Sequence, residues 1–204
     1  MTLKLYYAPG ACSLASHIAL EESGLPYTAE AIDGKTHKLQ DGTDFYTINP
    51  LGYIPVLRLD DGSTLREGPV IVQYIADQAP QKNLAPANGT LARYRLQEWL
   101  IFISTELHKN FGPLFNPATP DAYKTSVKDR LLARLSWLDG EIGGRDYLMG
   151  SQFTVADAYL FTVTNWAAPM GLDLSPLPRL NALRDRTAKR PAVQKAMQAE
   201  GLLK

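Results

Sequence analysis

The pattern of hydrophobic and polar residues changes its period within the first twenty positions. Residues 3–7 (LKLYY) alternate between apolar and polar or amphipathic side chains, which predicts a short strand. Pro9 and Gly10 then predict a turn, and apolar residues at helical spacing over residues 14–21 predict a helix. Cys12 is therefore expected where the strand hands over to the first turn of this helix.

The following sixty residues predict a second strand, a hairpin and a second helix. Residues 27–33 resemble a strand, and residues 34–43 are polar and are expected to form a loop. Short extended runs at 54–59 and 64–65 flank an Asp-Asp-Gly-Ser turn, which indicates a hairpin. A helix over residues 70–78 follows. The order is β-α-β, an irregular crossover, and β-β-α.

The remainder of the chain shows only helical periods. Prolines and polar residues predict a linker over residues 80–88, between a first domain of residues 1–79 and an all-helical domain of residues 89–204. Thr154 and Asp157 match a capping box at the start of an almost wholly apolar helix, which is expected at the domain centre. The predicted helices of this part are residues 96–107, 123–142, 158–166, 177–188 and 191–199.

Composition and charge exclude several classes of protein. Lys and Arg total 21 and Asp and Glu total 21, so the chain has no net charge and no general attraction to nucleic acid. The start lacks the pattern of a signal peptide, and no apolar run reaches the roughly 18 residues of a membrane span. One cysteine excludes an internal disulfide and fits a reducing compartment. We therefore expect a cytoplasmic protein without membrane or nucleic-acid partners.

Cys12 is the candidate nucleophile. The first amides of a helix lack intrahelical partners and carry partial positive charge, so a thiolate beside them is stabilised and the pKa of its thiol falls below about 8.5. The alternative is that Cys12 is a small buried hydrophobe, because free cysteine is among the most buried residue types. The three histidines show no metal-ligand spacing, and a single cysteine adds no zinc site, so no metal is expected.

Several motifs together resemble one family. A βαβ-ββα order with a cysteine at the first helix resembles the thioredoxin-like fold, and its union with a helical bundle containing FTVADAYLF resembles the glutathione transferases. The runs APGACS, INPLGYIPVL, EGPVIVQYIAD and ELHKNF are similar to the bacterial beta class, in which a cysteine replaces the tyrosine or serine of other classes. The resemblance covers essentially the whole chain.

The resemblance implies a glutathione site in the first domain. Cys12 would face the sulfur of glutathione, close enough to form a mixed disulfide. The backbone of Ile54, before a cis Pro55, would pair with the cysteinyl part of the tripeptide as an added strand does. Glu67 would meet the ammonium of the γ-glutamyl end, and amides at Gly68 would meet its carboxylate.

Further positions are implied on the first long helix and in the loop before the hairpin. His108, with Thr105 and Glu106, would lie near the active site or at a dimer interface, where His108 could hydrogen-bond the thiol pair or move its proton. The alternatives are a structural histidine and a solvated Glu106. His37 stands where the family usually has a lysine for the glycyl carboxylate, and Ile101 where relatives often carry an asparagine.

The expected function is conjugation of the thiol of reduced glutathione, as co-substrate, to hydrophobic electrophiles by a homodimeric enzyme. A second possibility is glutathione-dependent redox chemistry at Cys12, such as thiol transfer, peroxide reduction or reductive dehalogenation. Since Ala15 occupies the place of a resolving cysteine, that chemistry would follow a monothiol route. A third is a binding or regulatory protein without catalysis, because fold does not determine function.

Overall fold

The alternating residues at the start of the chain form a central strand of a four-stranded mixed sheet. In the computed structural model, which describes residues 2–203, the strands are β1 (Leu3–Tyr7), β2 (Tyr27–Ala31), β3 (Val56–Arg58) and β4 (Thr64–Arg66). Their order in the sheet is β2-β1-β3-β4. β1 runs parallel to β2 and antiparallel to β3, and β3 pairs with β4 in the predicted hairpin. The expected βαβ-ββα order is confirmed.

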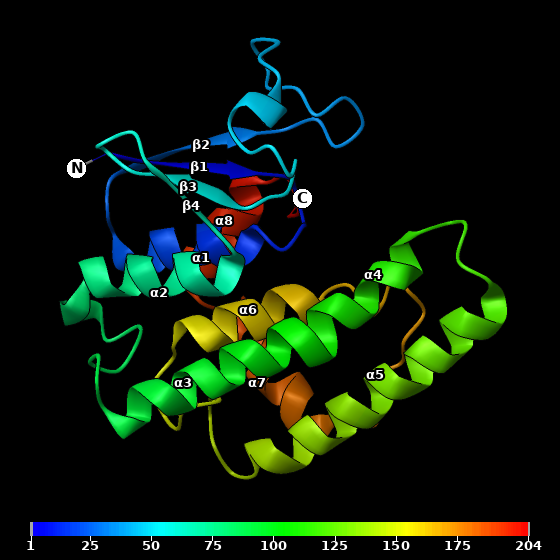
Figure 1. The fold of residues 1–204 in the computed structure, drawn as a ribbon. Coiled ribbons are helices and arrows are strands. Elements are labelled where there is room, and N and C mark those ends of the chain that lie inside the picture. The colour runs from blue at the N-terminus through cyan, green and yellow to red at the C-terminus, as the bar shows by residue number, and fades with distance from the viewer. Residues whose placement is uncertain (1, 204) are drawn as a thin grey trace. The chain divides into compact units, whose positions relative to one another are not determined.

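The two faces of the sheet are covered differently. The helices α1 (Leu14–Ser23) and α2 (Gly68–Gln78) pack side by side below the sheet in Figure 1. On the other face, side chains of the irregular segment 32–48 join Tyr6 of β1 in a buried cluster with Leu39 and Phe45, the latter at the start of the short 3-10 helix η1 (Phe45–Thr47). The central strands β1 and β3 are therefore mainly buried, the edge strands β2 and β4 are more exposed, and the connection between β2 and β3 is part of the core.

The last helix belongs to the same unit as this sheet. The chain divides into one unit of Met1–Ala85 with Arg190–Lys204 and a second of Pro86–Lys189. Helix α8 (Pro191–Ala199) packs on α1. The short 3-10 helix η2 (Pro80–Lys82) lies just before the chain leaves this unit after Ala85. This grouping differs from the predicted division, in which residues 89–204 form one domain. The reason is that buried polar contacts, which periodicity does not show, tie α8 to α1.

The second unit is entirely helical among the described residues. Its helices are α3 (Leu91–Phe102), η3 (Ile103–His108), α4 (Lys109–Phe115), α5 (Asp121–Ile142), α6 (Val155–Thr164) and α7 (Pro178–Ala188). Every residue of α6 is buried, as its apolar sequence predicts. The predicted capping box is confirmed, since Asp157 accepts hydrogen bonds from the Thr154 amide at 2.8 Å and the Thr154 hydroxyl at 2.9 Å. No helix within residues 2–203 combines the length and apolar character needed to cross a bilayer.

The helix predicted over residues 96–107 is interrupted. Residues Ile103–His108 form a π-helical turn between α3 and α4, where the regular pattern of backbone bonds is widened. Side chains bond the carbonyls of this region: the Thr105 hydroxyl donates to the Ile101 carbonyl at 3.0 Å, and the Asn110 amide donates to the Glu106 carbonyl at 2.8 Å. Because π turns concentrate at functional sites, this one directs attention to the residues it carries.

Candidate functional site

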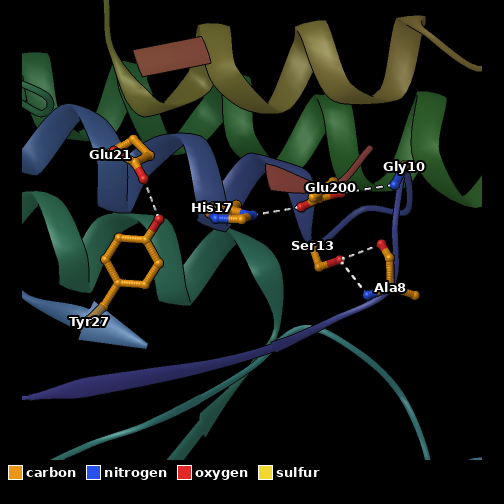
Figure 2. Close-up of polar contacts among 7 residues, drawn as sticks. All are labelled: Ala8, Gly10, Ser13, His17, Glu21, Tyr27 and Glu200. Carbon is orange, nitrogen blue, oxygen red and sulfur yellow. Dashed lines mark hydrogen bonds and ion pairs between the residues drawn. The ribbon is translucent and has the colours of Figure 1, made fainter. Parts of the chain in front are cut away.

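Cys12 lies in a short loop between β1 and α1 that is held by side-chain contacts. The Ser13 hydroxyl accepts from the Ala8 amide and donates to the Ala8 carbonyl, both at 3.2 Å, so it closes the loop across its base (Figure 2). The Cys12 thiol is half-buried and donates to the carbonyl oxygen of Ile54 at 3.3 Å. The loop therefore fixes the sulfur against the strand that enters the hairpin.

The prediction that the Cys12 thiol is ionised at neutral pH is wrong. Burial raises the pKa of the Cys12 thiol to about 11, and the Glu67 carboxylate adds to this, while the amides of Cys12 and Ser13 lower it only in part. Helix α1 begins at Leu14, so the sulfur precedes the N-cap rather than lying in the first turn. A pKa of about 11 leaves only about one thiol in ten thousand ionised at pH 7.

The segment that receives the thiol has the geometry that the resemblance implies. The peptide bond between Ile54 and Pro55 is cis, and Pro55 is buried. The Ile54 carbonyl has a second lone pair, so it can accept a further hydrogen bond while it holds the Cys12 thiol. Sequence resemblance implied this cis bond, and the structure contains it.

Glu67 and Gly68 form the start of α2. Glu67 is the N-cap residue, and its backbone has φ 68° and ψ 109°, a region that non-glycine residues rarely adopt. Such a conformation costs on the order of 1–3 kcal/mol and concentrates at ligand sites. The Glu67 carboxylate is exposed and has no hydrogen-bond partner within residues 2–203. A free carboxylate beside the outward-pointing amides of a helix start can bind a group that carries both an ammonium and a carboxylate.

His37 lies in the segment that covers the other face of the sheet. Its ring stacks on Tyr46 with centroids 5.0 Å apart, and its backbone has φ 53°. The Nδ1 atom is buried and has no hydrogen-bond partner within the described residues. Lys35 and Lys38, which lie on either side of His37 in the sequence, are exposed on the same loop. His37 is thus held in place by stacking rather than by a polar contact of its ring.

A buried hydrogen bond lies behind the cysteine loop and includes a residue from the end of the chain. His17 Nδ1 lies 2.9 Å from Glu200 Oε1, and both side chains are almost inaccessible to solvent (Figure 2). The other carboxylate oxygen of Glu200 accepts from the Gly10 amide at 2.9 Å. His17 is therefore structural, and no sequence pattern indicated its partner, because Glu200 is 183 residues away.

His108 lies in the π turn of the helical unit. Its Nδ1 lies 2.6 Å from the Tyr159 hydroxyl, and its ring packs edge-on against Trp166 with centroids 5.1 Å apart. Burial, together with the neighbouring charge of Lys109, lowers the pKa of His108 to about 4. The imidazole is therefore neutral at pH 7. The sequence analysis missed Tyr159, which is separated from His108 by 51 positions and looks like any apolar residue of α6.

Thr105 and Glu106 occupy the same turn but point their polar groups at local partners. The Thr105 hydroxyl donates to the Ile101 carbonyl, and Glu106 forms an ion pair with Arg134 of α5 at 2.7 Å. Both side chains of this ion pair remain partly exposed to solvent, so the alternative of a solvated Glu106 stays open. Within residues 2–203 no group of three His, Cys, Asp or Glu side chains is arranged to hold a metal ion.

Comparisons with known proteins agree along the whole chain. Residues 10–78 match the family described as "Glutathione S-transferase, N-terminal domain", and residues 102–191 match "Glutathione S-transferase, C-terminal domain". Glutathione S-transferase GstA of Escherichia coli O157:H7 is 46% identical over 200 residues, which cover 98% of this chain and 100% of the relative. The chain therefore belongs to the glutathione S-transferase family and is a transferase.

Solved structures narrow the class. One described as the ternary complex of BphK, a bacterial GST, is 54% identical with a TM-score of 0.96, covering 98% of this chain and 100% of that one. A sphingomonad glutathione S-transferase complexed with glutathione and a bacterial beta class enzyme of Sphingomonas chungbukensis are each 48% identical, with TM-scores of 0.95 and the same coverage. The resemblance to the bacterial beta class is confirmed.

Proposed function

We propose that this transferase conjugates the thiol of reduced glutathione to hydrophobic electrophiles, and that its first unit binds glutathione at Ile54, just before β3, and at Glu67 and Gly68, where α2 begins. The observation that carries the proposal is the contact between the Cys12 thiol and the Ile54 carbonyl next to a cis Pro55. It brings a sulfur to a backbone edge that can pair with an extended peptide. A relative of 48% identity was solved with glutathione bound, which supports the same ligand here.

In this proposal each end of the tripeptide has its own partners. The exposed carboxylate of Glu67 binds the ammonium of the γ-glutamyl group, and the amide of Gly68 binds the neighbouring carboxylate. Ile54 pairs with the cysteinyl backbone. His37, held by its stack on Tyr46, lies on the segment expected to meet the glycyl carboxylate. The strained backbone of Glu67 is consistent with a residue held for a ligand rather than for stability.

We propose a functional role for the π turn of the helical unit as well. A neutral His108 whose Nδ1 is bonded to Tyr159 can offer its other ring nitrogen as a hydrogen-bond donor or acceptor. With a pKa of about 4 it is a weak base, so hydrogen bonding is favoured over proton transfer as its role. Thr105 and Glu106 support this turn through their bonds to Ile101 and Arg134.

A conjugation assay tests the proposal. Purified protein is incubated with reduced glutathione and 1-chloro-2,4-dinitrobenzene, and glutathione binding is measured by calorimetry. We expect conjugation, and for Glu67→Gln we expect KM for glutathione to rise about tenfold, because one charge-assisted hydrogen bond contributes about 1.5–3 kcal/mol. The matched control is Asp129→Asn, which removes an exposed carboxylate on α5. The proposal is refuted if the unaltered protein shows no conjugation and no heat of glutathione binding.

Cys12 is also proposed to exchange with oxidised glutathione. Its thiolate attacks one sulfur of the disulfide, the Cys12–glutathione bond forms, and the second glutathione leaves as a thiolate that takes up a proton. Because Cys12 is the single cysteine, any adduct seen by intact-protein mass spectrometry lies there. If Cys12→Ala retains conjugation but loses disulfide reduction, Cys12 serves the redox route alone, which is the second function that this thiol supports.

We further propose that the enzyme is a cytoplasmic homodimer. Leu91, Tyr94 and Ile101 recur along one face of α3 and are 72%, 60% and 58% exposed, an apolar stripe of the kind that marks an interface. Light scattering should show that Tyr94→Glu has the molar mass of a monomer. Tyr123→Glu, which changes an exposed tyrosine on α5, should keep the molar mass of a dimer. The need for reduced glutathione and the free thiol support a cytoplasmic site, which cell fractionation tests.

A further inference from the structure

The loop that carries Cys12 is bonded to the end of the chain as well as to its own base. The carboxylate of Glu200, which is 5% exposed, accepts from the Gly10 amide with one oxygen and meets His17 with the other, both at 2.9 Å. Figure 2 shows Glu200 between these two partners. Gly10 precedes Cys12 by two residues, and His17 lies in the first turns of α1. One carboxylate therefore connects both sides of the cysteine.

A turn after α8 directs Glu200 to this place. Gly201 has φ 69°, and the Leu202 amide donates to the Met197 carbonyl at 2.8 Å, which reverses the chain at the helix end as a Schellman turn does. The Leu202 side chain then packs against Gly10, since a Cβ atom at Gly10 would lie 3.3 Å from Leu202 Cδ2. Two neighbouring residues of the C-terminal segment thus restrain the same backbone position.

The packing of α8 on α1 has a second anchor at the other end of α1. The Arg190 guanidinium makes two bonds to the Glu22 carboxylate, at 2.5 and 2.8 Å. Glu22 lies ten residues beyond Cys12 along the chain, in the last turn of α1. The anchors at Glu22 and at Glu200 can therefore be perturbed separately.

We propose that Glu200 is a positioning residue for Cys12: through Gly10 and His17 it holds the loop of residues 8–13 in the conformation that presses the thiol against the Ile54 carbonyl. Without the carboxylate, the Gly10 amide and His17 lose a buried partner and the loop loosens. The thiol then becomes more solvated, and its ionised form is penalised less. The consequence for glutathione turnover rests on the function proposed above, but the effect on the thiol does not.

The test measures the reaction of Cys12 with iodoacetamide between pH 6 and pH 11 in the absence of glutathione. For Glu200→Ala we expect the apparent pKa of Cys12 to fall by about one pH unit or more, and alkylation at pH 8 to be about tenfold faster, because only the thiolate reacts. KM for glutathione should rise in parallel, since the loop is no longer set for the tripeptide. A purely structural residue would change the melting temperature without changing the pH profile of the thiol.

The matched control is Glu22→Gln, which breaks the other anchor between α1 and α8 and should lower stability while leaving the alkylation profile unchanged. A profile for Glu200→Ala that equals that of the unaltered protein would overturn the proposal. If Glu200→Ala does not fold, Leu202→Ala replaces it, because Leu202 is 38% exposed and its loss is tolerable. We expect a smaller effect in Leu202→Ala, with alkylation about two- to threefold faster, since Glu200 keeps its contacts with Gly10 and His17 in that variant. An unchanged rate in that variant would equally refute the role of the C-terminal segment.

Discussion

Lowering the pH should destabilise the protein, and the contribution of His108 by itself should be large enough to measure. The folded protein holds the pKa of His108 at about 4, whereas the unfolded chain has the ordinary value of 6.5. Below pH 6.5 the unfolded state therefore binds a proton that the folded state refuses, so the stability present above pH 6.5 is lost as the pH falls toward 4. At about 1.4 kcal/mol for each pH unit, the whole effect is about 3 kcal/mol.

The cause of this difference can be separated from other titrating groups by a variant. Glutamine at position 108 keeps a polar side chain opposite Tyr159 but does not titrate. From the two pKa values, the unaltered protein should lose about 2 kcal/mol more than His108→Gln between pH 7.5 and pH 5, measured by urea unfolding at both pH values. Burial is the larger cause of the lowered pKa. The variant Lys109→Gln, which removes only the neighbouring charge, should therefore retain most of the pH dependence.

The reasoning fails in one clear case. If the unaltered protein and His108→Gln show the same dependence of unfolding free energy on pH, then the folded imidazole titrates near its ordinary pKa. Burial would then not hold His108 in its neutral form.

Three further substitutions test contacts described above by urea unfolding at pH 7.5. Tyr159→Phe removes the hydroxyl 2.6 Å from His108 Nδ1 and should lower the free energy of unfolding by about 1–2 kcal/mol; no change would mean that the bond adds nothing. Asp157→Ala removes the partner of the Thr154 amide and hydroxyl and of the Leu148 amide and should cost about 3 kcal/mol or more, whereas a loss below about 1 kcal/mol would contradict the capping role. Gly52→Ala forces a Cβ atom to 2.6 Å from Tyr46 Cε1 at φ 68° and should cost about 1–3 kcal/mol, while Gly34→Ala, with open space around it, should change little.

Sequence reasoning succeeded where burial follows a simple period. The strands β1, β3 and β4, the helices α5 and α6 and the Thr154 capping box were all visible, because each depends on residues within one element. The same is true of the position of Cys12 between β1 and α1. What was visible in each case is local: the buried face of α5, the wholly apolar sequence of α6, and the turn residues between β3 and β4.

The electrostatic state of the site could not be obtained in this way. The pKa of Cys12 depends on burial and on Glu67, which lies 55 positions along the chain, and that of His108 on the residues packed around it. The helix start alone favoured an ionised thiol. Desolvation has the opposite sign and is the larger cause, but it arises only from the assembled fold. The π turn was missed for a related reason, because apolar spacing does not show where one extra residue enters a helix.

The return of α8 to the first unit has a consequence for how the molecule is made. A ribosome releases the sheet and α1 early, yet α8, which covers α1, and the Glu200 carboxylate, which lies 183 residues after its partner His17, are synthesised much later. Until then, His17 and the apolar face of α1 remain exposed on the nascent chain. Exposed apolar surface of this kind binds chaperones and promotes aggregation. A chain interrupted before Glu200 should therefore be damaged first around Gly10 and His17.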